Sequence, residues 1–557
     1  MSNSAFLGLE ISLRGLYSSQ RGLATVSHNV DNTNTPGYSR QVVNQKAARP
    51  LLTAGRGGMI GMGSDVISVD RVRDTYLDEK YWGETQYFGE WYVKDTILKD
   101  IQAIYNEPSN SGFSKIINDF YDVLQQLSTD PSSPSVRNAL KERGIALARY
   151  FNSVATQFDR LQEDLNNMVY AKVEQINTLA DQIQQLNMQI FNYEVMGYTA
   201  NDLRDQRTYL VDQLSQLVNC EVYEVDTGYT LPNGMPEKRF VVAISGKALV
   251  DHKNVTHLKC VIREERLNFE DIGNLYEVVW EDGNTAVIKS GELKGYLDMR
   301  DGNDGLPAMN GEGNSPSCKG IPYYQRKMNE FVQVFARAFN EGIIDMNGDG
   351  VLTADDDDGP GHVDGYTLTG TEPSNIRFFT MLDAEGKPMD SETFEKMVRE
   401  YALAHGVDPG ASEFDLLVAG YGVLTARNFS ISFEINDDPV GNISASDTAG
   451  QSGNNGIVLS LIDMRHNPHT FMEGTGEDFI KTLISSLGVD GQQYSLYLGI
   501  QEGVVKQIER RRQSISGVSL NEEMVNMVKY QQVYAAAAKM IQAHSEVLDI
   551  LINQLGL

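Results

Sequence analysis

The sequence predicts a multidomain α+β protein. Its terminal helices pair as a coiled-coil-like bundle, next to a long helical bundle domain and one or more β-rich outer domains. Three observations support this fold class. The chain has 557 residues, more than one hydrophobic core can organise. Both ends carry apolar residues at alternating steps of three and four. Between them, one long helical pattern is followed by segments that alternate in the manner of strands.

The last stretch, residues 514–557, has the pattern of a helix with a coiled-coil-like seam. It contains no Pro, and no Gly lies between Gly517 and Gly556. A helix of this length would run about 60 Å at 1.5 Å per residue. Gln531 and Ser545 interrupt the seam, whose apolar positions are Leu520, Met524, Met527, Tyr534, Ala538, Ile541, Leu548, Ile552 and Leu555.

The first helix is expected over residues 4–30, and it carries a similar stripe. Gln20 and Ser27 interrupt it, and its apolar positions are Phe6, Leu9, Leu13, Leu16, Leu23 and Val30. If the two ends pair, everything between them is an insertion that leaves the bundle and returns to it. The alternative is two ordinary amphipathic surface helices.

Composition excludes several classes of protein. The net charge of −29 argues against a nucleic-acid partner, which needs a basic face, and against an anionic membrane surface. No apolar run reaches the roughly 18 residues of a membrane-spanning helix. The three cysteines show neither the spacing of a disulfide framework nor that of a zinc site. Glu10 and Arg14 interrupt the apolar positions at the start, so no signal peptide is expected.

A specific motif follows the first helix. Asn29, Asn32, Thr35, Pro36, Gly37 and Tyr38 precede a Ser-Arg pair. These residue types stop a helix and form a turn, which is the plainest interpretation. This motif also resembles the signature of the flagellar rod, hook and hook-associated protein family. That resemblance implies paired terminal helices in an inner tube, and export by the flagellar type III apparatus, with a chaperone, without signal cleavage.

A pair of long helices indicates which members of the family the chain resembles most. Residues 134–196 carry apolar residues at steps of four and three, with a break near Lys172 that suggests a stutter. A second helix is expected over 201–219. Within the family, this pair is typical of members at the junction between hook and filament. Residues 291–301, 429–459 and 478–557 resemble those members too. The stripe positions are Leu147, Phe151, Val154, Phe158, Leu161, Leu165, Met168, Leu179, Ile183, Leu186 and Ile190.

The remaining segments complete the predicted organisation. Residues 41–75 suggest short strands, 76–128 helices, 220–300 alternating strands, 301–320 a loop and 323–341 a helix. Residues 366–470 suggest short strands and turns, with one helix at 391–405. We therefore expect three domains: 1–65 with 514–557; 66–345 with 471–513, including a β-rich part at 220–300; and a β-rich outer domain, 346–470, with an insertion near 385–425.

One segment matches the loop of an EF-hand. Calcium prefers six to eight oxygen ligands, and a Gly at the sixth position permits the sharp turn. The twelfth position is Asp instead of Glu, and the residues after it cannot start a helix. An acidic surface turn and a weak calcium site both stay open. The candidate ligands are Asp345, Asn347, Asp349, Val351, Thr353 and Asp356.

No catalytic motif is present, and no cofactor is expected. His466 and His469 flank a Pro, which prevents the helical spacing of a zinc pair. The basic residues Lys506, Arg510, Arg511 and Arg512 form either a solvated helix face or a contact with an acidic neighbour.

The resemblance implies a structural adaptor rather than an enzyme. About eleven copies would assemble into a ring by symmetric contacts. The hook protein would lie below, and a second junction protein or the filament above. One alternative is another axial flagellar protein, such as hook or distal rod, which the helices at 134–219 argue against. A less favoured alternative is a calcium-dependent extracellular adhesive protein.

Overall fold

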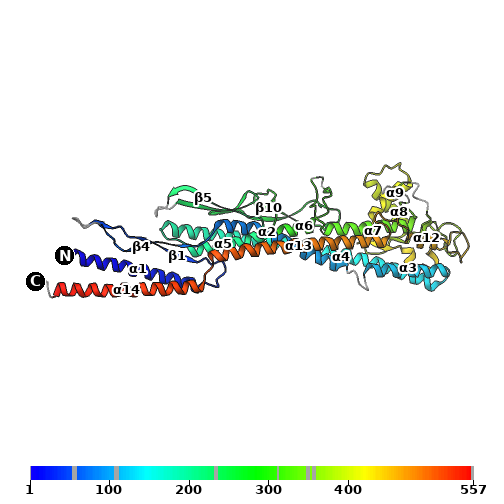
Figure 1. Cartoon of the computed structure of the whole chain (residues 1–557). Coiled ribbons are helices and arrows are strands. Elements are labelled where there is room, and N and C mark those ends of the chain that lie inside the picture. The colour runs from blue at the N-terminus through cyan, green and yellow to red at the C-terminus, as the bar shows by residue number, and fades with distance from the viewer. Residues whose placement is uncertain are drawn as a thin grey trace.

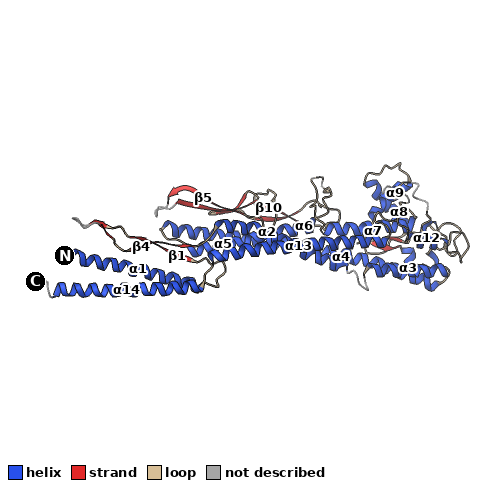
Figure 2. Ribbon diagram, viewed as in Figure 1, coloured by secondary structure: helices blue, strands red, loops and turns tan. Residues whose placement is uncertain are grey.

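The structure is a computed structural model that describes residues 2–52, 59–105, 112–230, 236–309, 311, 313–345, 352–353 and 359–553, without the side chains of 2–5, 551 and 552. The molecule is elongated, with both chain ends at one tip and a cluster of short elements at the other (Figure 1). Helices dominate, and the strands form small antiparallel sheets (Figure 2). The predicted α+β class is confirmed.

The terminal helices lie side by side, as expected. α1 (Ser2–Asp31) packs along α14 (Leu520–Asn553). A long hairpin of β1 (Gln41–Ala47) and β4 (Ser64–Arg71), extended by β2 (Leu51–Leu52) and β3 (Met59–Ile60), runs beside α1. Residues 2–52 and 59–71 therefore form a narrow stalk together with α14. We call α1 and α14 the terminal pair.

The body beside the stalk is a bundle of long helices. α13 (Gly476–Ser516) packs along α2 (Thr75–Tyr105), and α2 packs on α5 (Asn201–Leu217) and α6 (Glu292–Asp301). α4 (Pro134–Val195) completes the bundle. Strands β5 to β8 form one antiparallel sheet, and β9 and β10 form another beside α4. Their bounds are Glu221–Thr230, Pro236–Ile244, Lys247–Asp251, Asn254–Val255, Leu258–Ile262 and Tyr276–Trp280.

The expectation of strands up to residue 300 is wrong at its end, where the chain forms α6. Leu293 and Arg300 are fully buried. With Leu297, which packs against the same core, they fall at steps of four and three, the period of a helix face. Gly291, at φ 96°, sets the backbone that enters the helix.

α4 is continuous through Lys172, but its buried stripe shifts there. Met168, predicted in the stripe, is exposed, while Val169 is fully buried. Buried residues of α4 up to Leu165 belong to one hydrophobic core, and those from Val169 onward belong to a second. The break in the sequence pattern therefore marks the point where one helix passes from one core to the next.

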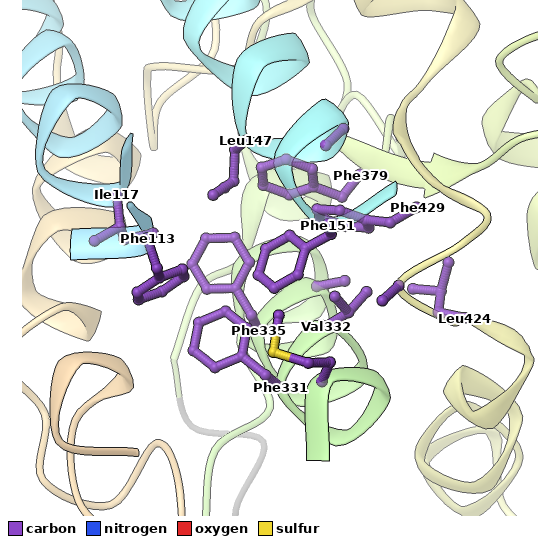
Figure 3. Packing of buried hydrophobic residues seen from close by; sticks show 14 of the residues in the cluster. Phe113, Ile117, Leu147, Phe151, Phe331, Val332, Phe335, Phe379, Leu424 and Phe429 are labelled. Carbon is purple, nitrogen blue, oxygen red and sulfur yellow. The ribbon is translucent and has the colours of Figure 1, made fainter. Parts of the chain in front are cut away.

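The first core is aromatic. Phe113 of α3 (Phe113–Thr129) and Phe151 of α4 both contact Phe331 of α7 (Ile321–Glu341), with the rings of Phe151 and Phe331 stacked at a centroid distance of 5.4 Å. Phe379 and Phe429, which lie on two short paired strands, stack on each other and pack against this aromatic cluster (Figure 3). Large rings interlocked in this way hold the body and the far end of the molecule as one packed unit.

The far end, residues 359–470, has more helix than expected. Besides α8 (Ser391–Ala404), it contains α9 (Glu413–Gly420), α10 (Phe433–Asp437), α11 (Pro439–Asn442) and α12 (Gly456–Met464). The only strands among its described residues are β11 (Phe379–Met381) and β12 (Phe429–Ile431). These short helices are too brief to show a helical period in the sequence. The division of the chain into three domains remains a prediction.

Candidate functional site: the terminal pair and its joint

Small residues form the seam between α1 and α14. Gly8, Gly15 and Gly22 recur every seven residues and face His544, Ala537 and Tyr530, which recur at the same spacing in the opposite direction. A Cβ placed on Gly22 would lie 2.6 Å from Tyr530 Cε1, and one on Gly15 would lie 3.9 Å from the Ala537 Cβ. The two antiparallel helices therefore pack most closely where α1 has no side chain.

Hydroxyl residues of α1 support this close approach. Ser12 and Ser19 are buried, and each donates a 2.9 Å hydrogen bond to the carbonyl four residues earlier, at Gly8 and Gly15. Thr25 does the same to Arg21 at 3.0 Å. Because these bonds stay within the helix, the hydroxyls can be buried without a partner on α14.

The predicted stripes lie beside this seam rather than in it. On α1, Leu9, Leu13, Leu16 and Leu23 are half-buried, and Phe6 is 58% exposed. On α14, Met527, Ile541 and Leu548 are half-buried, whereas Leu520, Met524 and Tyr534 are exposed. Ile552 and Leu555 lie outside the described side chains. The glycine repeat was missed from the sequence, although its spacing of seven is visible there.

The motif after α1 forms a compact turn. Asn29 is buried, accepts bonds from the Tyr38 hydroxyl at 2.7 Å and the Gln41 amide at 2.9 Å, and donates to the Gln41 carbonyl. Asn32 donates to the His28 carbonyl and accepts from the Thr35 hydroxyl, both at 3.0 Å. Burial raises the pKa of Tyr38, so this hydroxyl stays a hydrogen-bond donor.

Gly37, which follows Pro36, holds the turn against the body. Its φ is 78°, and an added Cβ would lie 2.8 Å from the Tyr209 Cβ of α5. A side chain there would be strained and would collide. Just beyond, the backbone N–H and hydroxyl of Ser39 each donate a 2.8 Å hydrogen bond to Asp205 of α5. The motif therefore fastens the end of α1 to the body.

Buried ion pairs complete this connection, which we call the joint. Arg71 at the end of β4 pairs with Asp205 at 2.9 Å, and Arg73 pairs with Asp78 of α2 at 2.7 Å. Arg512 of α13 pairs with both Asp78 at 3.0 Å and Asp212 of α5 at 2.8 Å. Burial raises the pKa of Asp212, and Arg512 partly offsets that rise. Strand, turn and three helices thus meet around shared charges.

The joint also reaches α14. The Arg40 amide donates to the Ser516 carbonyl at 2.8 Å, and its guanidinium pairs with Glu522 at 2.7 Å. Residues 33–40, α5 and residues 509–522 surround a polar cavity of about 830 Å³. Of the predicted basic cluster, Arg512 is therefore an internal contact, Lys506 pairs with Glu502, and Arg510 and Arg511 are exposed.

The candidate calcium loop falls mostly outside the described residues. Asp345 and Thr353 are described, whereas Asn347, Asp349, Val351 and Asp356 are not. Over the described ranges, no group of three or more His, Cys, Asp or Glu side chains has the geometry to hold a metal ion. Nor does any described helix combine the length and the apolar character needed to cross a membrane.

Comparison with known proteins extends over the whole chain. The family model for the flagellar hook-associated protein FlgK helical domain matches residues 98–350, and that for the flagellar basal body rod FlgEFG protein C-terminal matches 511–555. Flagellar hook-associated protein 1 of Bacillus subtilis is 27% identical over 99% of both chains. The proteins of the same name from Salmonella typhimurium and Escherichia coli are 27% and 26% identical over 97% of this chain and 98% of theirs.

One solved structure shows the same fold. The flagellar hook junction protein FlgK from Burkholderia pseudomallei aligns with a TM-score of 0.51 and 15% identity, over 80% of this chain and 100% of that one. Paired terminal helices, a long helical body and these two family models define an axial structural protein of the bacterial flagellum. Along its whole length the chain is similar to flagellar hook-associated protein 1, and its longest helical part matches the model of that protein's helical domain. The names of these relatives and of both family models all describe structural parts of the flagellum.

Proposed function

We propose that this chain is the adaptor at the junction between the flagellar hook and the filament, outside the cell. The observation that carries the proposal is similarity along 97–99% of the chain to proteins named flagellar hook-associated protein 1. The similarity extends over the body and the far end as well as the terminal helices. A hook or rod protein would be expected to match these relatives only at its two ends, so this alternative is disfavoured.

The terminal pair has the properties of an assembly element. Its seam is narrow, and much of the apolar surface of both helices remains exposed, including Phe6 on α1 and Met524 on α14. A helix that is apolar beyond the face it buries is stable only when further surfaces cover it. We infer that neighbouring copies supply those surfaces, with about eleven copies closing a ring.

The joint gives such a ring its mechanical role. The buried charge pair at Asp205 ties β4 of the stalk to α5, and the pairs at Asp78 and Asp212 hold the end of α13, which leads into α14, against α2 and α5, so that a load on the terminal pair reaches the long helices. In this proposal the hook protein contacts the ring from below, and a second junction protein or the filament contacts it from above. An export chaperone and the flagellar type III apparatus deliver the chain. A rigid ring of this kind would separate two lattices that move differently.

Electron microscopy of a deletion strain tests the function. Cells that lack the chain should carry complete hooks without filaments and should release unassembled filament protein, and the full-length gene should restore the filaments. Cells without hooks would identify the chain as a rod or hook component instead. Normal filaments on the deletion strain would overturn the proposal.

A further inference from the structure

α13 is poorly covered over most of its length. Its buried residues are Phe479, Ile480, Leu483 and Leu487 near its start and Arg512 near its end. Between 488 and 511 no residue is buried, although this stretch contains many apolar side chains. Val489, Leu496 and Ile500 are 63%, 61% and 54% exposed. α2 covers one side of the helix and leaves the outer side open.

The open side has a regular order. Seven positions at alternating steps of three and four are all exposed and all uncharged, and we call them the α13 row: Thr482, Ser485, Val489, Gln492, Leu496, Gly499 and Gly503. A Cβ on Gly499 or Gly503 would have no atom within 4 Å. Glycine in a helix interior is destabilising, and no neighbour among the described residues requires it at these two positions.

A second row of the same kind lies on α4. Its seven positions follow the same steps, are all exposed and carry no charge, and we call them the α4 row: Met168, Ala171, Gln175, Thr178, Gln182, Gln185 and Gln189. A groove of about 360 Å³ runs beside its second half, between α4 and α5. Each row spans about 32 Å at 1.5 Å per residue, so the two match in length and in spacing.

The charges near the rows lie apart from each other. Glu163 and Asp164 precede the α4 row on its far-end side and Glu174 flanks it, whereas Arg510 and Arg511 follow the α13 row on its joint side. In parallel helices these acidic and basic side chains do not face each other, so the contact depends on the uncharged rows themselves. A chain with a net charge of −29 repels its own copies, so copies can meet only where both faces lack charge or where charges are complementary.

We propose that the α13 row of one copy packs against the α4 row of the next copy. The proposal rests on the ring described above, since copies related by rotation about the flagellar axis keep these helices parallel. α4 and α13 both run from the far end of the molecule toward the joint (Figure 1). A ring needs two different faces that fit each other. The two rows are such faces, and the glycines let the helices approach closely.

Disulfide cross-linking within isolated flagella tests this contact. Gly499→Cys is combined in turn with Ala171→Cys, Thr178→Cys or Gln185→Cys, so that one pair comes within reach for any axial offset that places Gly499 beside the α4 row. At least one double variant should form a ladder of covalent oligomers after oxidation. Gly499→Cys alone should form none, and neither should Gly499→Cys with Thr393→Cys on the far end. The native chain gives the background from Cys220, Cys260 and Cys318.

Two results would overturn the contact. One is a dimer from Gly499→Cys alone, because α13 would then meet its own copy. The other is the absence of a ladder in every double variant, while immunogold labelling finds the chain at the junction. Absence of labelling at the junction would instead refute the proposed function, and this inference with it.

Charge insertion gives an independent readout. Leu496→Glu should leave the melting temperature of the isolated chain unchanged, since the side chain is exposed, and should abolish filament attachment. Leu459→Glu on α12, also at an exposed leucine, should leave both unchanged. Gly499→Ala should raise the melting temperature of the isolated chain and weaken assembly. Normal assembly by both Leu496→Glu and Gly499→Ala would contradict the contact.

Discussion

Gly22 of α1 lies directly against the ring of Tyr530 in α14, so that an added Cβ would come within 2.6 Å of Tyr530 Cε1. Gly22→Ala should therefore force the two helices apart, at a cost of about 1–3 kcal/mol for overpacking. Hydrogen exchange of the α14 amides in assembled flagella should become faster. Adding Tyr530→Ala should restore the slow exchange by making room.

Gly15→Ala is the matched control, because its new methyl would sit 3.9 Å from the Ala537 Cβ, an ordinary contact. Alanine also favours the helix by about 1 kcal/mol over glycine. This variant should assemble normally. Equal damage from Gly15→Ala and Gly22→Ala would mean that the glycines act through helix propensity and not through the seam.

Arg512 is the charge on which the joint depends, because Asp78 and Asp212 share it. Arg512→Met should destabilise the body by about 3–5 kcal/mol, the usual cost of leaving a buried charge without its partner, because Asp212 loses its ion pair while Asp78 keeps Arg73. Denaturant unfolding of the isolated chain measures this. Arg511→Met, one residue earlier and exposed, should change stability by less than about 0.5 kcal/mol.

The loss in Arg512→Met should also depend on pH. Burial already raises the pKa of Asp212 in the folded chain, and removing Arg512 raises it further. A carboxyl with a raised folded pKa binds its proton more readily when folded, so stability increases as the pH falls through that pKa. The deficit of the variant should shrink in acid. A deficit that stays constant from neutral to acid pH would place the damage elsewhere.

Features that repeat along the sequence could be predicted from it, whereas features that depend on tertiary packing could not. The terminal helices and α4 were predicted because their apolar positions repeat over many turns, and the motif at 29–38 because its residue types are specific. The shift from Met168 to Val169 was misread, because a step in a stripe marks a change of core that only tertiary packing reveals.

The ion pairs of the joint and the short helices of the far end could not be predicted from the sequence, for related reasons. Arg512 looked like a member of a basic cluster, and nothing local shows that Asp78 and Asp212 fold against it from hundreds of residues away. In the far end, α12 contains Ile457 and Val458, β-branched residues that also suit a strand. Its helix is too short for a period to decide between the two. Ser412 and Asp415 form a capping box at the start of α9, and this pair is a helix-start signal that is visible in the sequence.

His362 should make the far end sensitive to acid. Its Nδ1–H donates to the Ile376 carbonyl at 2.7 Å, and its Nε2 accepts from the Ser444 amide at 3.0 Å, an arrangement that needs a neutral ring. Burial lowers its pKa to about 4. The unfolded chain therefore binds a proton first, and stability falls as the pH drops from about 6.5 to about 4, by up to about 3 kcal/mol.

Melting temperatures across this window check the prediction. His362→Gln cannot take up the proton, so its stability should be lower than native at neutral pH but should decline less between pH 6.5 and 4. An equally steep decline in the variant would assign the acid sensitivity to other groups.

Calcium binding by the segment from Asp345 to Asp356 remains a prediction. If Asp345, Asn347, Asp349 and Asp356 ligate the ion, calcium at 100 times its dissociation constant should stabilise the chain by about 2.7 kcal/mol. Titration calorimetry with millimolar calcium, and melting with and without a chelator, measure this. Asp349→Asn should remove the effect. No heat and no change in melting would leave an acidic turn.

The last prediction concerns the terminal pair in the free chain. Ordering backbone costs about 1–2 kcal/mol per residue, and a two-helix pair has only one thin seam to offset it. Here the α1 side of that seam consists largely of glycines and serines, while Leu13 and Leu548 beside it are only half-buried. Both ends should therefore be largely disordered in the monomer and become helical only against neighbouring copies.

Limited proteolysis of the monomer should remove roughly the first 40–65 and the last 40 residues and leave a stable body that cannot cap hooks, because unpaired ends are the accessible part of a chain. Leu13→Asp with Leu548→Asp should keep the melting temperature of the body and abolish assembly. Leu147→Asp, within the buried stripe of α4, is the contrasting control and should unfold the body. If amides at 525–550 of the monomer exchange as slowly as those at 147–190, the terminal pair folds on its own and the prediction is wrong.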